Sequence, residues 1–264
     1  MTEKLIELKN IFYSAEGDNL SLRKKESTDI LFDVSFLVSE KEIVGICGES
    51  GGGKSTLAKL IAGIIKPTKG ELILNNKISP QNNKPQKIQI LFQNSSDLVN
   101  PYRKISTIIN EALKLTATKK ENIETGKNKL IETININPAL LNRRGLGLSG
   151  GERQRIALAR LLAVKPKVLI LDEPFSAQDI TSQINFVKLL KKINQEMEVT
   201  IICISHDLKI LRNLAHKIII LKEGKVVEAG TTEDVFNNPQ SSYTRFLLSA
   251  ESLELSYDEL HSRN

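Results

Sequence analysis

The spacing of apolar residues changes several times along the chain, and this pattern predicts a mixed α/β protein. Loose alternation over residues 5–13 and 29–47 predicts strands, with a turn at Ser39 to Lys41. The polar, turn-rich residues 14–29 predict an exposed loop that joins two antiparallel strands. Residues 42–64 then read as a strand, a glycine loop and a helix. The first third of the chain is therefore expected to be rich in strands.

The middle of the chain has a different character. Two more short strands are expected at residues 71–79 and 87–94. From about residue 94 to residue 165, apolar residues recur at helical spacing and strand signals are few. The helical segments are 105–115, 127–136 and 150–164. This region is expected to be a helical insert.

Two continuous apolar runs follow, at residues 167–174 and 199–207, and each ends in acidic or polar residues. Buried parallel strands show this pattern when their carboxyl ends face a site. Residues 180–195 supply the crossover helix between them. The end of the chain predicts a hairpin over 217–230 that turns at Glu223 and Gly224, and then closing helices with Thr232 as a cap.

Composition limits the class of protein without naming it. The chain has 264 residues, 40% of them hydrophobic, which suits one large domain or one domain with an inserted subdomain. No apolar run approaches the roughly eighteen residues of a membrane-spanning helix. The first residues, MTEKLIELKN, lack the pattern of a secretory signal, so a cytoplasmic protein is expected.

Charge and cysteines point to no special chemistry. The formal net charge of +6 is scattered through lysine-rich segments, which favours a solvated basic surface over a nucleic-acid site. Cys47 and Cys203 each lie inside an apolar run without ligand spacing, so both are expected to be reduced core residues.

The glycine loop at residues 48–56, GESGGGKST, carries the clearest chemical signal. Gly48, Gly53, Lys54 and Ser55 satisfy the pattern GxxxxGK[ST], between an apolar strand and a helix. Glycines let backbone N–H groups turn toward a phosphate, and the helix dipole favours the anion. Lys54 would reach the outer phosphates and Ser55 would offer its hydroxyl to Mg²⁺. The expected nucleotide-binding residues here are Gly48, Glu49, Ser50, Gly51, Gly52, Gly53, Lys54, Ser55 and Thr56.

The later strands would supply acid–base groups. Asp172 ends the first apolar run and is expected to hold Mg²⁺, as a strand-end aspartate does in phosphate-loop enzymes. Glu173 follows it and is expected to be the general base that orients the attacking water. His206 ends the second run, where its imidazole could contact the γ-phosphate or that water.

A second glycine loop, LSGGE at Leu148 to Glu152, also opens a helix. Ser149, Gly150 and Gly151 have the character of an anion site. This loop cannot contact the phosphates that Lys54 of the same chain holds unless the fold doubles back. The simplest interpretation is that it binds a phosphate held by another molecule.

Taken together, these segments resemble the ATP-binding cassette ATPases over nearly the whole chain. The motifs are residues 48–56 as Walker A, Gln93 as the Q-loop, Leu148 to Glu152 as the signature, Asp172 and Glu173 as the end of Walker B, Ser176 to Asp179 as the D-loop, and His206 as the switch histidine.

The resemblance implies a phosphate-loop (RecA-like) α/β core with an antiparallel β-subdomain, at residues 1–93 and 166–264. A helical subdomain at residues 94–165 would carry the signature. ATP and Mg²⁺ are the implied cofactors, and Ser55, Gln93 and Asp172 are the implied Mg²⁺-binding residues. Lys54, Gln93, Glu173 and His206 would be the catalytic groups.

In that family two cassettes pair head to tail, and each ATP lies between the Walker A of one and the signature of the other. The resemblance therefore implies that Ser149 and Gly151 touch the partner's ATP, with Gly150 beside them and Asp179 at the interface. It further implies a paralogous or identical second cassette, permease subunits, an extracytoplasmic solute-binding protein, and a peripheral place on the cytoplasmic face of the membrane. Nucleic acid is not an expected partner.

Finer features are similar to the subfamily that imports peptides and nickel. These are residues 88–105, which include the Q-loop and the segment after it, and the stretch FNNPQSSYTRFLLSA at 236–250. The local similarity is nearest to the second ATPase subunit of nickel importers. Departures from the family are Gln178 in place of leucine, Glu152 in place of the common glutamine, and Ala15 where an adenine-stacking aromatic is expected. Tyr13 is the candidate that would stack instead.

Two other functions were open on the residues. A soluble cassette protein acting on nucleic acid or ribosomes would share the signature, but such proteins typically carry long coiled coils, zinc modules or two cassettes. A phosphate-loop kinase would share Lys54, Ser55 and Asp172, but it leaves LSGGE without a role. The cargo is not encoded in any motif of the chain.

Overall fold

The structure, a computed structural model, describes residues 3–16, 27–80, 85–93, 98–116, 122–176 and 178–252, with side chains as far as residue 250. Most of the predicted loop at 14–29, the four residues after Gln93 and one residue of the D-loop, Ala177, lie outside these ranges. The chain divides into two compact units. The first comprises Met1–Leu5, Ser39–Lys41 and Leu74–Ile202, and the second comprises Ile6–Val38, Glu42–Ile73 and Cys203–Asn264.

The first unit contains parallel strands, as the apolar runs predicted. β5 (Ile88–Leu91) pairs in parallel with β6 (Val168–Asp172), and Ile88 lies opposite Val168. β7 (Thr200–Ile204) follows β6 in the sheet order, and the boundary between the units falls within β7. Every residue of β6 and β7 is buried. Apart from Asp172 and Thr200, these two strands consist of apolar residues, as expected when both faces of a strand are covered.

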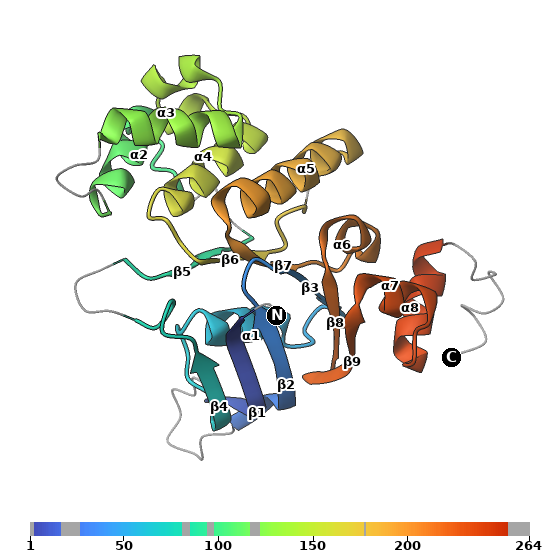
Figure 1. Ribbon diagram of the computed structural model, residues 1–264. Coiled ribbons are helices and arrows are strands. Elements are labelled where there is room, and N and C mark those ends of the chain that lie inside the picture. The colour runs from blue at the N-terminus through green and yellow to red at the C-terminus, as the bar shows by residue number, and fades with distance from the viewer. Residues whose placement is uncertain are drawn as a thin grey trace, which may run out of the picture. The chain divides into compact units, whose positions relative to one another are not determined.

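The helices of the first unit are α2 (Ile105–Lys114), α3 (Ile123–Ile134), α4 (Gly150–Leu162) and α5 (Ile180–Met197), with 3₁₀ turns at Pro138–Asn142 and Gly145–Gly147. α2, α3 and α4 pack against one another, as Figure 1 shows. Asn122 caps the start of α3, and Asn135 ends it in the left-handed conformation. The predicted helical character of this stretch is confirmed, whereas its delimitation as a subdomain at 94–165 stays a prediction.

The second unit contains most of a three-stranded sheet in the order β2-β1-β4, formed by β2 (Ser27–Ser39), β1 (Lys4–Glu16) and β4 (Lys69–Leu74). β4 is shorter at its end than the predicted strand at 71–79. The backbone turns at Asn75, whose carbonyl oxygen accepts the N–H of Ile78 and whose side chain accepts the N–H of Lys77. This asparagine turn ends the strand.

The second unit also contains β3 (Ile43–Gly48), which pairs in parallel with β8 (Lys217–Lys222). β8 and β9 (Lys225–Thr231) form the predicted hairpin, and both Glu223 and Gly224 at its turn have positive φ. The hairpin and its turn are therefore confirmed. Cys47 and Cys203 are buried free thiols, as predicted.

The helices of the second unit are α1 (Lys54–Ile61), α6 (Leu208–Leu214), α7 (Thr232–Asn237) and α8 (Ser242–Ser252). The prediction of Thr232 as a cap is wrong by one residue. Thr231 caps α7 through Asp234 N, while the Thr232 hydroxyl donates to Ala215 O at 2.7 Å. None of the described helices in either unit has both the length and the apolar character that a membrane crossing requires.

Candidate functional site

The phosphate loop lies in the second unit, between β3 and α1. Gly48 ends β3 with φ 151°, and a Cβ there would lie 1.9 Å from the carbonyl oxygen of Leu221 on β8. Only glycine allows this approach of the loop to the neighbouring strand. The loop continues through the exposed Glu49, Ser50 and Gly51 into α1.

Lys54 is the first residue of α1, and its side chain folds back over the loop. Its Nζ donates to the carbonyl oxygens of Gly48 and Glu49, at 2.7 Å each, and the residue is only 7% exposed. Ser55 is exposed and Thr56 half-buried in the same first turn. The ammonium group is thus fixed at the start of the loop, beside the N-terminus of a helix where an anion is favoured.

His206 lies in the same unit, just after β7. The N–H of Ser205 donates to Ile46 O at 3.1 Å, and the Cys47 thiol donates to the carbonyl oxygen of His206 at 3.6 Å. Asp207 caps α6 through the N–H of Ile210. These bonds place the backbone of His206 beside the residue that precedes Gly48, and its side chain is exposed.

A residue of the C-terminal helix also reaches the phosphate loop, and it was not among the predicted site residues. Tyr243 of α8 is buried, and the Nζ of Lys222 lies 4.9 Å from the centroid of its ring. Burial, and next the neighbouring Glu49 carboxylate, raises the pKa of the Tyr243 hydroxyl above its usual range. The hydroxyl lies beside Glu49 without the geometry of a regular hydrogen bond. The similarity of residues 236–250 to the subfamily that imports peptides and nickel was the sequence signal for this segment.

Asp172 and Glu173 follow β6 in the first unit. Asp172 is 5% exposed, and its Oδ1 is buried without a hydrogen-bond partner among the described residues. An unpaired buried carboxylate oxygen suits a hard cation, and carboxylate is a ligand that Mg²⁺ prefers. Glu173 has φ 50°. Its carbonyl oxygen accepts two hydrogen bonds from Ser176, one from the N–H at 3.4 Å and one from the side-chain hydroxyl at 3.1 Å. The turn after β6 is therefore tightly held.

The second glycine loop opens α4 as a complete capping box. The Ser149 hydroxyl accepts the N–H of Glu152 at 3.3 Å, and Glu152 Oε2 accepts the N–H of Ser149 at 2.8 Å. The bond from the Ser149 backbone is the main cause that lowers the pKa of Glu152. The departure from glutamine at this position is thus compatible with the cap.

Gly150 and Gly151 of that loop are exposed, and a Cβ built on either would meet no heavy atom within 4 Å. Neither residue has the positive φ that favours glycine. The described part of the chain gives no internal reason for glycine at these positions, unlike Gly48. An approach of another molecule to this surface does give one.

Gln178, the other departure, forms a network. Its Nε2 donates to Gln154 Oε1 at 2.6 Å and to Pro174 O at 3.0 Å, and Gln154 Nε2 donates to the same carbonyl at 2.6 Å. A leucine could not make these bonds. The network joins α4, which carries the signature loop, to the segment after β6.

Asp179 follows Gln178 and caps α5. Its carboxylate accepts the N–H of Ser182 at 2.9 Å and the Ser182 hydroxyl at 2.7 Å. The hydrogen bond from the Ser182 hydroxyl, and next the bond from the Ser182 N–H, lowers the pKa of Asp179.

Two further predicted site residues are Gln93 and Tyr13. Gln93, two residues after β5, is exposed, and Tyr13 on β1 is partly exposed. Their roles stay predictions.

A family model described as ABC transporter matches residues 31–176, a stretch that includes the phosphate loop, the signature loop and the strand that ends at Asp172. This chain belongs to the ABC transporter ATPase family. The resemblance stated from the motifs is confirmed, and so is the α/β fold of a phosphate-loop ATPase.

Curated relatives of this ABC ATPase cover most of its length. The oligopeptide transport ATP-binding protein OppF of Bacillus subtilis is 36% identical over 95% of this chain and 83% of its own length. The dipeptide transport ATP-binding protein DppF of Haemophilus influenzae is 38% identical over 86% of this chain and 72% of its own length. Both are transport proteins, so the alternative of a cassette acting on nucleic acid or ribosomes is not supported.

Solved structures of ABC proteins have the same fold. cbiO1 of Clostridium perfringens, part of the transporter complex cbiONQ, superposes with a TM-score of 0.77 at 25% identity over 98% of this chain and 97% of its own. A dimeric ATP-binding cassette in a post-hydrolysis state with ADP and phosphate superposes with a TM-score of 0.70 at 27% identity, over 86% of this chain and 99% of its own. This ABC ATPase is thus an ATP-binding and ATP-hydrolysing subunit of a transporter.

Proposed function

We propose that this ABC ATPase powers the import of peptides. The observation that carries the proposal is the similarity to peptide transport ATP-binding proteins over nearly the whole chain, 36% for the oligopeptide protein and 38% for the dipeptide protein. The nickel importers, to which the ending at 236–250 is also similar, remain the comparison for the test.

Peptide import is tested on the complete transporter in proteoliposomes, with its permease subunits and its solute-binding protein. The expected result is ATP hydrolysis that rises several-fold when a peptide-loaded binding protein is present. Nickel-loaded binding protein is the matched comparison. Stimulation by nickel and not by peptides would overturn the peptide assignment.

Roles in hydrolysis are proposed for the described side chains. Lys54 and the amides of the phosphate loop hold the β- and γ-phosphates, and Tyr13 contacts the adenine. Ser55, Gln93 and Asp172 hold Mg²⁺, which supplies positive charge against the charge that develops on the phosphoryl group. The buried unpaired oxygen of Asp172 supports its part in this set. Glu173 takes a proton from the attacking water, and His206 orients the γ-phosphate.

A second cassette is proposed to complete the site, with Ser149, Gly150 and Gly151 against its ATP and Asp179 at the interface. The open surface over Gly150 and Gly151 supports this, because the chain itself leaves room there that a phosphate and a partner loop would fill. Permease subunits, an extracytoplasmic binding protein and a peripheral place on the cytoplasmic membrane face complete the proposal. Residues 94–165 are proposed as the subdomain that carries the signature.

Glu173→Gln tests both the base and the pairing. The variant keeps the size of the side chain and removes its basicity, so it is expected to bind ATP with nearly unchanged affinity and to hydrolyse it at least 100-fold more slowly. Light scattering after gel filtration with ATP and Mg²⁺ should then show a dimer, alone or with the paralogous cassette. Brisk hydrolysis by the variant would rule out Glu173 as the base.

A further inference from the structure

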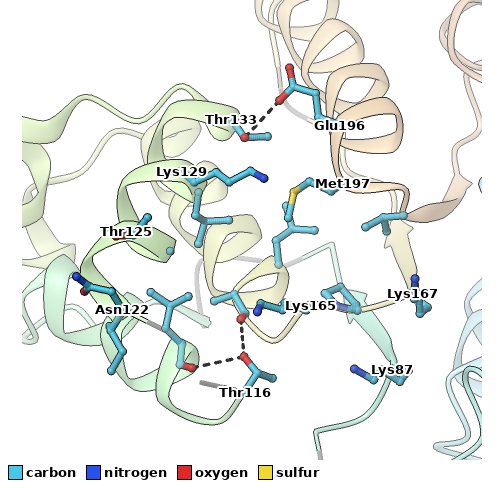
Figure 2. Close-up of a pocket in the computed structure, with 18 residues that line it drawn as sticks. Lys87, Thr116, Asn122, Thr125, Lys129, Thr133, Lys165, Lys167, Glu196 and Met197 are labelled. Carbon is cyan, nitrogen blue, oxygen red and sulfur yellow. Dashed lines mark hydrogen bonds between the residues drawn. The ribbon is translucent and has the colours of Figure 1, made fainter. Parts of the chain in front are cut away.

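A pocket of about 820 Å³ lies entirely within the first unit, among the described residues. Its walls come from α3, the ends of α2, α4 and α5, and the residues just before β5, β6 and β7, as Figure 2 shows. No residue of the phosphate loop, signature, D-loop or strand-end carboxylates lines it. The volume is typical of small-molecule sites in proteins, so the pocket is large enough for a ligand of its own.

The inner walls of the pocket are mostly apolar. The side chains that form them include Leu113, Leu130, Leu162, Ala163, Met197 and Val199. Among the polar lining residues, the Thr116 hydroxyl is turned to the protein, donating to Ala163 O at 3.1 Å. The apolar part of the walls favours an apolar body in the pocket.

The charged groups around the pocket are mostly basic. Four lysines, Lys87, Lys129, Lys165 and Lys167, line it together with one carboxylate, that of Glu196. Glu196 already accepts a bond from the Thr133 hydroxyl at 3.3 Å and lies 3.9 Å from Nζ of Lys192, which is outside the lining. Within the lining, the lysines therefore outnumber the carboxylate four to one.

The lysines approach the pocket from different elements. In Figure 2 the chain of Lys129 extends from α3 toward Met197, while Lys87 and Lys167 stand on the opposite wall. Glu198, next to Met197, pairs with Lys41 at 2.5 Å and is also influenced by the charge of Lys167. The four pocket lysines still outnumber the two carboxylates, Glu196 and Glu198. Long flexible ammonium side chains can converge on one anionic group while their stems cover apolar surface.

We propose that this pocket binds an amphiphilic anion, with a single acyl chain along the apolar walls and its carboxylate or phosphate among the lysines. The apolar walls alone would accept any hydrophobic compound. The excess of ammonium groups selects an anion over a neutral or cationic compound of the same length. The site is separate from the nucleotide chemistry and does not rest on the peptide assignment.

Two lining residues allow the chemistry and the volume of the site to be tested separately. Lys129→Glu reverses one exposed charge without touching the core. Gly126→Leu adds a large side chain to the pocket wall on α3, at a position where a Cβ would lie 3.7 Å from Leu113, an ordinary contact. Lys188→Glu is the matched control, since Lys188 is an exposed helical lysine outside the lining.

The test is calorimetric titration of the purified 264-residue chain with dodecanoate below its micelle concentration. Saturable binding to one site is expected, weakened at least tenfold by Lys129→Glu, removed by Gly126→Leu and changed less than twofold by Lys188→Glu. Dodecyltrimethylammonium, with the same chain and the opposite charge, should bind at least tenfold more weakly. Equal binding of the cation, or unchanged binding by both pocket variants, would overturn the proposal.

The same anion could come from solution or from a bilayer, and flotation with phosphatidylcholine vesicles, with and without phosphatidylglycerol, separates the two sources. If the chain binds dodecanoate but does not float with vesicles, the ligand of the pocket is a free acyl anion from solution. Flotation that needs phosphatidylglycerol and is lost in both Lys129→Glu and Gly126→Leu assigns a lipid of the bilayer. Absence of both dodecanoate binding and flotation would refute the site.

Discussion

At the scale of single residues, two buried charged groups of this ATPase differ in how they are satisfied. The ammonium of Lys54 is held by the carbonyl oxygens of Gly48 and Glu49. The Oδ1 of Asp172 is buried with no hydrogen bond among the described residues. A buried polar atom without a partner destabilises the fold and is retained where it serves a ligand. The Asp172 side chain is therefore expected to lower the stability of the fold while it supports activity, whereas the Lys54 side chain is not expected to lower the stability.

Asp172→Asn separates those two effects. The amide has the same shape but no charge to bury, so the free energy of unfolding, measured with urea in EDTA without nucleotide, should be unchanged or higher by about 1 kcal/mol. ATP hydrolysis with Mg²⁺ should fall at least 100-fold. A clearly less stable variant would mean that the carboxylate is satisfied within the chain and is not reserved for a cation.

At the scale of elements, the β8–β9 hairpin lies close against β2. Gly224 at its turn has φ 74°, and a Cβ there would lie 2.1 Å from Ile30 O. The N–H of Phe32 donates to Gly224 O at 2.9 Å, and the N–H of Gly224 donates to Gly52 O at 3.2 Å. The turn thus links β2 to the phosphate loop through the backbone.

Gly224→Ala and Gly63→Ala form a matched pair for this contact. Both glycines have φ above 70°, but the space around the Cβ position of Gly63 is open. Gly63→Ala should lower the unfolding free energy by only about 1 kcal/mol, the cost of the left-handed conformation. Gly224→Ala should lower the unfolding free energy by at least about 2 kcal/mol more than Gly63→Ala does, because the backbone of Ile30 must move. Equal losses in urea denaturation would contradict the close approach.

The start of α8 is held by a carboxylate of β9. Glu228 accepts the N–H of Gln240 at 2.8 Å and that of Ser241 at 3.0 Å. Burial by itself would raise the pKa of Glu228, but the nearby Thr244 hydroxyl, the bonds from the N–H groups of Gln240 and Ser241 and the charge of Arg245 outweigh it and lower the pKa below its ordinary value of 4.5. A charged Glu228 therefore stabilises the attachment of the helix that carries Tyr243.

The sign of this shift sets a pH dependence. A carboxyl whose pKa is lower in the folded chain stabilises it fully above the unfolded pKa, and the contribution is lost as the pH falls through the folded pKa. At pH 7 the free energy of unfolding of the wild type should be about 1 kcal/mol higher than that of Glu228→Gln. The difference should shrink steadily below pH 4.5, the ordinary value. A difference in unfolding free energy that stays constant from pH 7 to pH 4 would rule out this role.

At the scale of the whole molecule, the signature loop has surface that the chain does not use. Ser149 and Glu152 satisfy the first turn of α4 by themselves, so the glycines between them are not needed for the helix. Glycine is unfavourable at helical positions. Their presence fits a requirement that arises only when a second cassette approaches.

Gly151→Ala tests that requirement. In the isolated chain it should leave the unfolding free energy unchanged or raise it by up to about 1 kcal/mol, because alanine is the better helix former. In the assembled transporter it should lower ATP hydrolysis at least tenfold, since a Cβ enters the space meant for the partner's nucleotide. Thermal unfolding of the chain and ATPase assays of the complex measure the two effects, and full activity of the complex would argue against contact at this surface.

Much of the fold could be predicted from local patterns. Apolar runs of the right length indicated β6 and β7, and helical periodicity indicated α2 to α5, because burial of one face requires these periods. The seven-residue helix α6 was missed because it is too short to show a period. The cap of α7 was misplaced by one threonine because both hydroxyls suit a cap locally, and only packing commits Thr232 to Ala215 O.

The sequence alone was sufficient for the family and the chemistry of the phosphate loop, because a backbone that wraps a phosphate needs glycines, a lysine and a hydroxyl at set positions along one short segment. The contacts between distant segments needed the tertiary structure. The packing of Tyr243 beside Glu49, the bond of Gln178 to Gln154, and the lysine-lined pocket each join residues far apart in the chain. No local pattern records such proximity, because it depends on how whole elements pack.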